Sequence, residues 1–251
     1  MALNRQILQD YYRENPLMIS SPFGGVDGIK GDLLLDTFKK LDISIEARRV
    51  LDVGCGRGYA ESIVREAGGD YTGCDFVASR PGLKFALADG SQLPFPASAF
   101  DGVFCIDAFE HFPEGPAAAC EFHRVLKDDG FVFLSVPNYS NVAGLVKAYC
   151  EKTGSYRPNT WAPFRQWQPQ EFESALTAQR VRRMFTDAGF TRFRCIGYGP
   201  EVCLGLFPWI AHRRMPEAVM FRLQKLFGLI GPGIANVWPG ASLHMFWKIE
   251  K

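Results

Sequence analysis

The chain has 251 residues, of which 47% are apolar, so it is long enough to bury one large α/β core. Its 28 basic and 27 acidic residues nearly balance, which gives no electrostatic reason to expect nucleic acid as a partner. The seven cysteines lack CxxC spacing and are odd in number. This pattern argues against a zinc site or disulfide framework and is typical of thiols in a reducing compartment. The polar N-terminus has no apolar signal core, so we expect a cytoplasmic protein.

The first half of the chain alternates between predicted strands and helices. Helical spacing of apolar residues predicts helices over 5–14 and 29–41, within an N-terminal helical segment, 1–45. Short apolar runs bounded by Gly, Asp or Pro then predict strands at 49–53, 71–75, 85–89, 102–107 and 131–136, with helices at 59–67 and 116–126. This alternation predicts an α/β fold with a doubly wound, mostly parallel sheet.

The pattern loosens after residue 137. We expect a single domain that spans 1–251, with insertions over 138–175 and 199–240. The sequence predicts further helices at 174–188 and 216–230, the second of them amphipathic, and further strands at 191–198 and 242–249. Residues 226–247 carry no charged side chain and are long enough to cross a bilayer. Because glycines and prolines interrupt them, we expect a buried or surface-docking segment instead.

The stretch "VLDVGCGRGYAES", residues 50–62, places three glycines in five positions directly after a predicted strand. Such a junction lets the backbone turn sharply and lets a ligand lie against it. The spacing Gly54-x-Gly56-x-Gly58 differs from the GxGxxG of dinucleotide-binding proteins, and no Walker lysine follows it. The alternative to a ligand site is a plain tight turn.

Acidic residues recur where successive strands end. Asp75, Asp89 and Asp107 each close or follow a predicted strand, on the side of a doubly wound sheet where ligands bind. Asp75 could accept both hydroxyls of a ribose, and Asp89 could accept from an adenine amine. Each alone could equally be a helix cap or a turn residue. Together with the glycine loop, they favour a nucleoside site.

The segments "VLDVGCGRGYAES", "YTGCDF", "LADGSQLPFPASAFDGVFCIDAFEHF" and "EFHRVLKDDGFVFLSVPN" resemble class I S-adenosylmethionine-dependent methyltransferases of the small-molecule, ubiquinone-methyltransferase-like branch. The resemblance implies a Rossmann-like sheet of seven strands with the last antiparallel, and S-adenosylmethionine as cofactor with S-adenosylhomocysteine as product. One departure is that Phe76–Lys84, between the second and third strands, is too short for the family's usual helix. We therefore expect the adenine side of the cofactor pocket to be more open than in the family, or to be covered by another segment of the chain.

The resemblance also implies roles for individual residues. Asp52 and the glycine loop would hold the methionine moiety, and Asp75 would hold the ribose. Adenine would lie beside Asp89 and Gly90 and pack on Phe76, and Ile106 and Asp107 would bound the sulfonium end. The implied cofactor-binding set is Asp52, Gly54, Cys55, Gly56, Gly58, Asp75, Phe76, Asp89, Gly90, Ser91, Ile106 and Asp107.

Methyl transfer from a sulfonium is an in-line displacement, so alignment and desolvation supply much of the catalysis. A general base is required only if the nucleophile holds its proton, and His111 is the candidate base. The alternative is that Glu110 and His111 only fix their loop. A weaker alternative is a divalent metal site formed by Asp107, Glu110 and His111, in which Asp107 replaces the family's glutamate.

Aromatic residues in the least regular segments predict a substrate pocket for a small apolar or aromatic acceptor, with oxygen as the first expected target atom and carbon as the second. The predicted pocket residues are Tyr11, Tyr12, Phe23, Tyr156, Trp161, Trp167 and Trp209. Their alternative role is the core of an enlarged cap. Residues 199–240 join bulky apolar and basic residues, which suits either peripheral membrane contact, as for a prenyl-quinone substrate, or a homodimer. The alternative to an enzyme is a non-catalytic subunit that binds S-adenosylmethionine.

Overall fold

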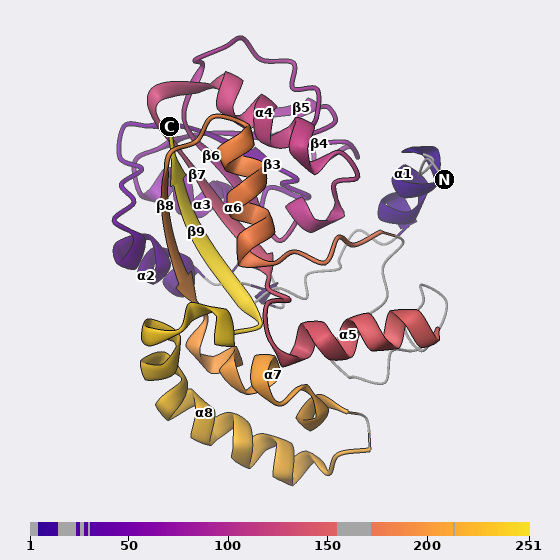
Figure 1. Ribbon diagram of the computed structural model, residues 1–251. Coiled ribbons are helices and arrows are strands. Elements are labelled where there is room, and N and C mark those ends of the chain that lie inside the picture. Colours follow the sequence, from indigo (N-terminus) through magenta and orange to yellow (C-terminus); the bar gives the residue numbers. More distant parts are fainter. Residues whose placement is uncertain (1–4, 15–23, 26–27, 30, 155–171, 213) are drawn as a thin grey trace. The chain divides into compact units, whose positions relative to one another are not determined.

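The computed structural model describes most of the chain, and Figure 1 shows its elements in sequence colours. The described residues are 5–14, 24–25, 28–29, 31–154, 172–212 and 214–251. The chain divides into two compact units. The first unit comprises Met1–Ser135, Arg182–Arg194 and Trp247–Lys251, and the second comprises Val136–Val181 and Cys195–Phe246.

Seven strands of the described residues form one mixed sheet in the order β5-β4-β3-β6-β7-β9-β8. Their bounds are β3 Arg49–Val53, β4 Asp70–Asp75, β5 Phe85–Leu87, β6 Phe100–Ile106, β7 Leu126–Pro137, β8 Arg192–Gly197 and β9 His244–Glu250. The ladders that join β5, β4, β3, β6 and β7 are all parallel. The last strand, β9, is antiparallel to β8, because Thr191 N–H donates to Glu250 O while Tyr198 N–H donates to His244 O. The predicted fold class is therefore confirmed.

The central strands β3, β6 and β7 are mostly apolar and buried, as is typical of parallel strands in a sheet that helices cover. In the first unit, α2 (Gly31–Leu41) places Phe38 against the rings of Phe104 and Phe133, with centroids 5.3 and 5.0 Å apart. Helix α4 (Gly115–Val125) places Phe122 against Phe185 of α6 (Ala178–Asp187). Burying such aromatic rings stabilises the unit by about 2–3 kcal/mol for each side chain.

The remaining elements of the first unit are short. Helix α1 spans Arg5–Glu14, and β1 (Gly24–Gly25) pairs antiparallel with β2 (Gly28–Ile29). Helix α3 spans only Glu61–Glu66, so the predicted helix over 59–67 begins later, after the turns of the glycine loop.

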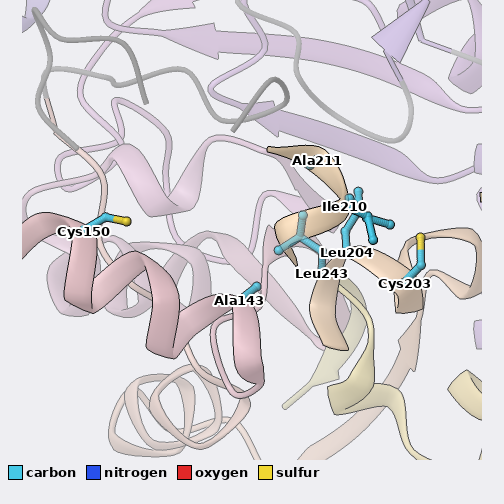
Figure 2. Close-up of a cluster of buried hydrophobic side chains, with 7 residues drawn as sticks. All are labelled: Ala143, Cys150, Cys203, Leu204, Ile210, Ala211 and Leu243. Carbon is cyan, nitrogen blue, oxygen red and sulfur yellow. The ribbon is translucent and has the colours of Figure 1, made fainter. Parts of the chain in front are cut away.

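The second unit is built around helices α5 (Val142–Thr153), α7 (Val202–Leu206) and α8 (Glu217–Val237), with short 3₁₀ turns between them. Helix α7 packs against both α5 and α8. Figure 2 shows the buried apolar cluster of this unit, which comprises Ala143, Cys150, Cys203, Leu204, Ile210, Ala211 and Leu243. None of the helices described is long and apolar enough to cross a membrane.

Helix α8 runs further than the sequence predicted. The expected helix over 216–230 was too short, because α8 continues through Pro232 to Val237. A Cβ built on Gly231 would lie 2.1 Å from Gly199 O, so the two backbones touch at this point. This packing of α8 on the 3₁₀ turn at Gly199–Glu201 outweighs the local cost of glycine and proline.

Candidate functional site

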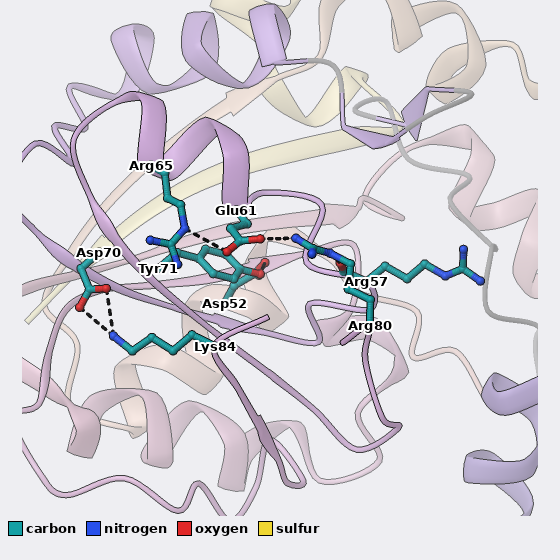
Figure 3. Close-up of polar contacts among 8 residues, drawn as sticks. All are labelled: Asp52, Arg57, Glu61, Arg65, Asp70, Tyr71, Arg80 and Lys84. Atoms are coloured by element: carbon teal, nitrogen blue, oxygen red, sulfur yellow. Dashed lines mark hydrogen bonds and ion pairs between the residues drawn. The ribbon is translucent and has the colours of Figure 1, made fainter. Parts of the chain in front are cut away.

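A buried carboxylate lies on β3, two residues before the glycine loop. Asp52 is 3% exposed, and Tyr71 of β4 donates a hydrogen bond of 2.8 Å from Oη to its Oδ2 (Figure 3). Burial raises the pKa of Asp52 from 3.8 to about 7, while the Tyr71 hydrogen bond opposes this rise and the charge of Asp75 adds to it. Asp52 is therefore poised to respond to a nearby cation at neutral pH.

The glycine loop requires its glycines. Gly54, Gly56 and Gly58 all have positive φ, at 76°, 53° and 74°, a conformation that costs an L-residue about 1–2 kcal/mol. A Cβ on Gly54 would also lie only 2.4 Å from Cβ of Ala108, two residues after the end of β6. The loop backbone therefore presses against the neighbouring strand end.

Asp75, at the end of β4, is bonded to this loop. Its Oδ2 accepts from Gly56 N–H at 2.8 Å, and its Oδ1 accepts from Val77 N–H at 3.1 Å. Burial raises the pKa of Asp75, and the backbone hydrogen bonds partly offset the rise. The structure thus brings together the loop and the first of the acids that were singled out in the sequence.

The loops after β3 and β5 both approach Phe112, a residue after β6 that the sequence analysis did not single out. A Cβ built on Gly90 would lie 2.7 Å from Cε2 of Phe112, and one on Gly54 would lie 3.6 Å from its Cζ. The ring of Phe112 therefore lies next to both glycines, on the side where a side chain would project. Beside it, Asp89 Oδ1 accepts from Ser91 N–H at 2.8 Å and from Ser91 Oγ at 2.7 Å, which fixes the loop after β5.

The segment after β6, which ends at Ile106, carries the candidate base. Asp107 has a φ of 48°, and its Oδ1 accepts a 2.5 Å hydrogen bond from Ser135 Oγ. Nε2 of His111 lies 3.7 Å from Oε1 of Glu110, and both side chains are largely buried. Among the His, Cys, Asp and Glu residues that the structure describes, no group of three or more could hold a metal ion. The geometry therefore gives no support to the metal alternative.

Two predicted pocket residues lie on α1. The ring of Tyr12 is 6.0 Å from that of His111 and 5.7 Å from that of Phe76, measured between centroids, and it forms an edge contact with Tyr11. Gln9 on the same helix donates from Nε2 to Phe76 O at 3.4 Å. Helix α1 thus reaches both the predicted adenine side and the candidate base.

The other predicted pocket residues are Trp209 and four residues that the structure does not describe. Trp209 belongs to the second unit, is half exposed and packs edge-on against Phe207 at 5.4 Å. The remaining four, Phe23, Tyr156, Trp161 and Trp167, lie outside the described residues.

The short β4–β5 connection is bonded to the glycine loop and to helix α3, and Figure 3 shows its Arg80 beside Arg57 and Glu61. Ser79 Oγ donates to Gly56 O at 2.6 Å, and Nε of Arg80 donates to Arg57 O at 3.1 Å. The Arg80 guanidinium also pairs with the carboxylate of Glu61 in α3. A Cβ on Gly58 would meet Leu83 Cδ1 at 2.7 Å. In place of a helix, three contacts therefore join this connection to the glycine loop, and the ion pair joins it to helix α3.

The residues present suit a nucleoside that carries an amino-acid tail. The Oη atom of Tyr59 is buried and has no hydrogen-bond partner among the described residues, while its ring lies against Gly56, 3.4 Å from a Cβ built there. A polar ligand group at the loop would satisfy that hydroxyl. Asp75 supplies acceptors and Asp52 a potential negative charge on the same side of the sheet.

Known proteins resemble this chain in sequence. Residues 29–192 match a family model described as a methyltransferase domain. The chain is 31% identical over 121 residues to a ubiquinone biosynthesis O-methyltransferase of Bordetella avium, covering 42% of this chain and 49% of that protein. It is 28% identical to a demethylmenaquinone methyltransferase of Thermus thermophilus, and the match covers 64% of this chain and 84% of that protein. The chain spans about half the length, or less, of several curated relatives that it matches.

A solved structure resembles the fold. The phosphoethanolamine N-methyltransferase 2 of Haemonchus contortus, solved in complex with phosphomonomethylethanolamine and S-adenosylhomocysteine, aligns with a TM-score of 0.59 at 15% identity. The alignment covers 96% of this chain and 59% of that one. At this identity the likeness concerns the fold alone.

Proposed function

Because the chain belongs to the S-adenosylmethionine-dependent methyltransferase family, we propose that it transfers a methyl group from this cofactor to a small, mainly apolar or aromatic acceptor. The observation that carries the proposal is the bond from Gly56 N–H to Asp75, which joins the glycine loop to the strand end expected to hold a ribose. Oxygen is the favoured target atom and carbon the second. The Bordetella and Thermus relatives, both named for quinones, support this class of acceptor.

In this proposal, each part of the cofactor has its own set of residues. The carboxylate of Asp75 accepts the ribose hydroxyls, while the loop after β5, with Asp89, Gly90 and Ser91, lies along the adenine. Phe76 packs on the adenine ring. When bound, the cofactor supplies a methyl group on a positively charged sulfur. The chain orients that group and excludes water around it, which favours an in-line displacement.

The methionine end would lie between the glycine loop and Asp52. The cofactor's ammonium favours the ionised form of Asp52, whose pKa of about 7 makes ionisation sensitive to a nearby positive charge. The buried hydroxyl of Tyr59 would donate to the cofactor's carboxylate. Binding would thus satisfy a buried polar atom and neutralise a buried acid together.

His111 would accept the acceptor's proton where the nucleophile is a hydroxyl. Its position supports this role, because its ring lies beside Tyr12 near the end of β6 and it is largely shielded from solvent. Its ring nitrogen is also 3.7 Å from Glu110, which can orient the imidazole. The competing role is to fix the loop only.

Transfer of a labelled methyl group from S-adenosylmethionine to a panel of hydroquinones and phenols tests the proposal. We expect turnover of at least one apolar aromatic hydroxyl compound and, for His111→Gln, a loss of about a hundredfold in kcat with cofactor affinity unchanged. Full activity of His111→Gln would eliminate the base role. Tight cofactor binding without turnover of any acceptor would instead favour the non-catalytic binding subunit.

A further inference from the structure

Helix α8 carries large apolar side chains on its solvent side as well as on its packed side. Inward, Leu223, Phe227 and Ile234 pack on the buried clusters of the second unit. Outward, apolar side chains are between 42 and 89% exposed. These outward residues are Val219, Phe221, Leu226, Leu229, Ile230, Val237 and, directly after the helix, Trp238. We call the outward set, with Arg222 and Lys225, the α8 surface.

The spacing places cationic and apolar residues on one side of the helix. Arg222, Lys225 and Leu229 follow one another at intervals of three and four residues, so they share a face. All three side chains belong to exposed residues. The cations lie in the N-terminal half, and from Leu226 to Trp238 the surface has no charge at all. Figure 1 shows α8 as one continuous helix along this unit.

The α8 surface is also poor in acidic residues. Between Glu217 and Glu250 the sequence contains no Asp or Glu, while Arg222, Lys225 and Lys248 are present. An acid-free apolar surface with cations matches the chemistry of a bilayer that contains anionic lipid. Apolar side chains enter the boundary between headgroups and acyl chains, cations meet lipid phosphates, and Trp238 suits the interface itself.

A second copy of the chain fits the same surface less well. In a two-fold symmetric contact each copy presents the same patch, so Arg222 and Lys225 of both copies would be brought together. Glu217 is the one acid of α8 available to compensate them. Like charges at an interface oppose association unless they are paired. Charge therefore favours lipid over self-association.

We propose that the α8 surface docks the protein peripherally on anionic bilayers. Docking goes beyond methyl transfer and does not depend on it. It would place the protein where apolar acceptors dissolve.

Co-sedimentation of the full chain with vesicles tests this proposal. We expect binding to vesicles of phosphatidylcholine with phosphatidylglycerol, weakening with added salt, and little binding to phosphatidylcholine alone. Leu229→Ser combined with Val237→Ser should reduce the bound fraction at least about tenfold, since insertion depends on buried apolar area. Arg222→Glu combined with Lys225→Glu should remove the preference for anionic lipid.

Leu145→Ser is the matched control, because Leu145 is 74% exposed on α5 of the same unit but lies outside the α8 surface. It should bind vesicles like the unaltered protein. S-adenosylhomocysteine affinity should stay the same in all variants, which separates docking from cofactor binding. Failure of the unaltered protein to bind anionic vesicles, or equal loss in Leu145→Ser, would overturn the proposal. A dimer in sedimentation velocity that Leu229→Ser dissociates, without vesicle binding, would overturn it in favour of an interface.

Discussion

Tyr71 donates a hydrogen bond of 2.8 Å to Asp52, and both side chains are buried on neighbouring parallel strands, β4 and β3. The bond favours the charged carboxylate, while burial favours the neutral acid, and burial dominates because the pKa of Asp52 is raised to about 7. Two residues before the glycine loop, the protein thus holds an acid that changes charge near neutral pH.

Removal of the Tyr71 hydroxyl should weaken cofactor binding near pH 7. In Tyr71→Phe the Asp52 carboxylate loses its donor, so its pKa should rise further and less of it should be ionised. We expect several-fold weaker S-adenosylhomocysteine binding at pH 7, with recovery as the pH rises toward 9. Calorimetric titrations across this range measure the effect. An affinity deficit that is independent of pH would contradict the assigned role.

Stability should depend on pH through Asp52. Its folded-state pKa of about 7 is above the unfolded value of 3.8, so the unfolded chain releases this proton first as the pH rises. The stabilising contribution of neutral Asp52 to the free energy of unfolding is therefore fully present below about pH 4 and is lost as the pH rises through about 7. The free energy of unfolding changes by an amount on the order of 4 kcal/mol at most. Asp52→Asn should remove this part of the dependence.

Urea unfolding of both proteins between pH 4.5 and 8 measures that difference. As the pH rises through this range, the free energy of unfolding of Asp52→Asn should increase relative to that of the unaltered protein. A constant difference between the two proteins would show that Asp52 titrates normally in the fold.

A methyl group at Gly54 should cost far more than one at Gly82. Both glycines have positive φ, but a Cβ on Gly54 would lie 2.4 Å from Cβ of Ala108, while nothing lies within 4 Å of one on Gly82. We expect Gly82→Ala to destabilise by about 1 kcal/mol, from backbone strain alone. Gly54→Ala should cost about 2 kcal/mol more and abolish cofactor binding. Thermal unfolding and calorimetry compare the two, and equal effects would refute the close approach of the loop to β6.

The contacts of the β4–β5 connection should support cofactor affinity. Arg80→Ala removes the hydrogen bond to Arg57 O and the ion pair with Glu61, and we expect the Kd for S-adenosylhomocysteine to rise about two- to fivefold. Lys84→Ala is the matched control, because Lys84 lies in the same connection but pairs with Asp70. Its Kd should not change. If both variants weaken binding equally, the connection acts through general stability instead.

Sequence patterns identified the strands and the acids at their ends, because buried parallel strands are apolar and strand ends carry the polar residues. They did not identify Phe112, whose contacts with Gly54 and Gly90 join three segments distant in sequence. The Tyr71–Asp52 bond was missed for a similar reason, since pairing depends on the register of two strands. The available signal was the tyrosine hydroxyl in the predicted strand that follows the one carrying Asp52.

The length of α8 also escaped prediction. Its breakers, Gly231 and Pro232, are tolerated because the helix packs on Gly199 from a separate part of the second unit. Local propensity cannot anticipate such a contact. The connection between β4 and β5 was correctly expected to lack a helix, but its bonds to the glycine loop depend on three-dimensional proximity.

The central claim is that the glycine loop and Asp75 form the binding site for S-adenosylmethionine. Its most direct test is calorimetric titration of S-adenosylhomocysteine into the unaltered protein, Asp75→Ala and the control Asp70→Ala, whose exposed carboxylate begins the same strand. One molecule should bind the unaltered protein and Asp70→Ala equally, and Asp75→Ala should bind at least about tenfold more weakly, since hydrogen bonds to a charged group are lost. Undiminished affinity in Asp75→Ala, or no binding to the unaltered protein, would contradict the claim.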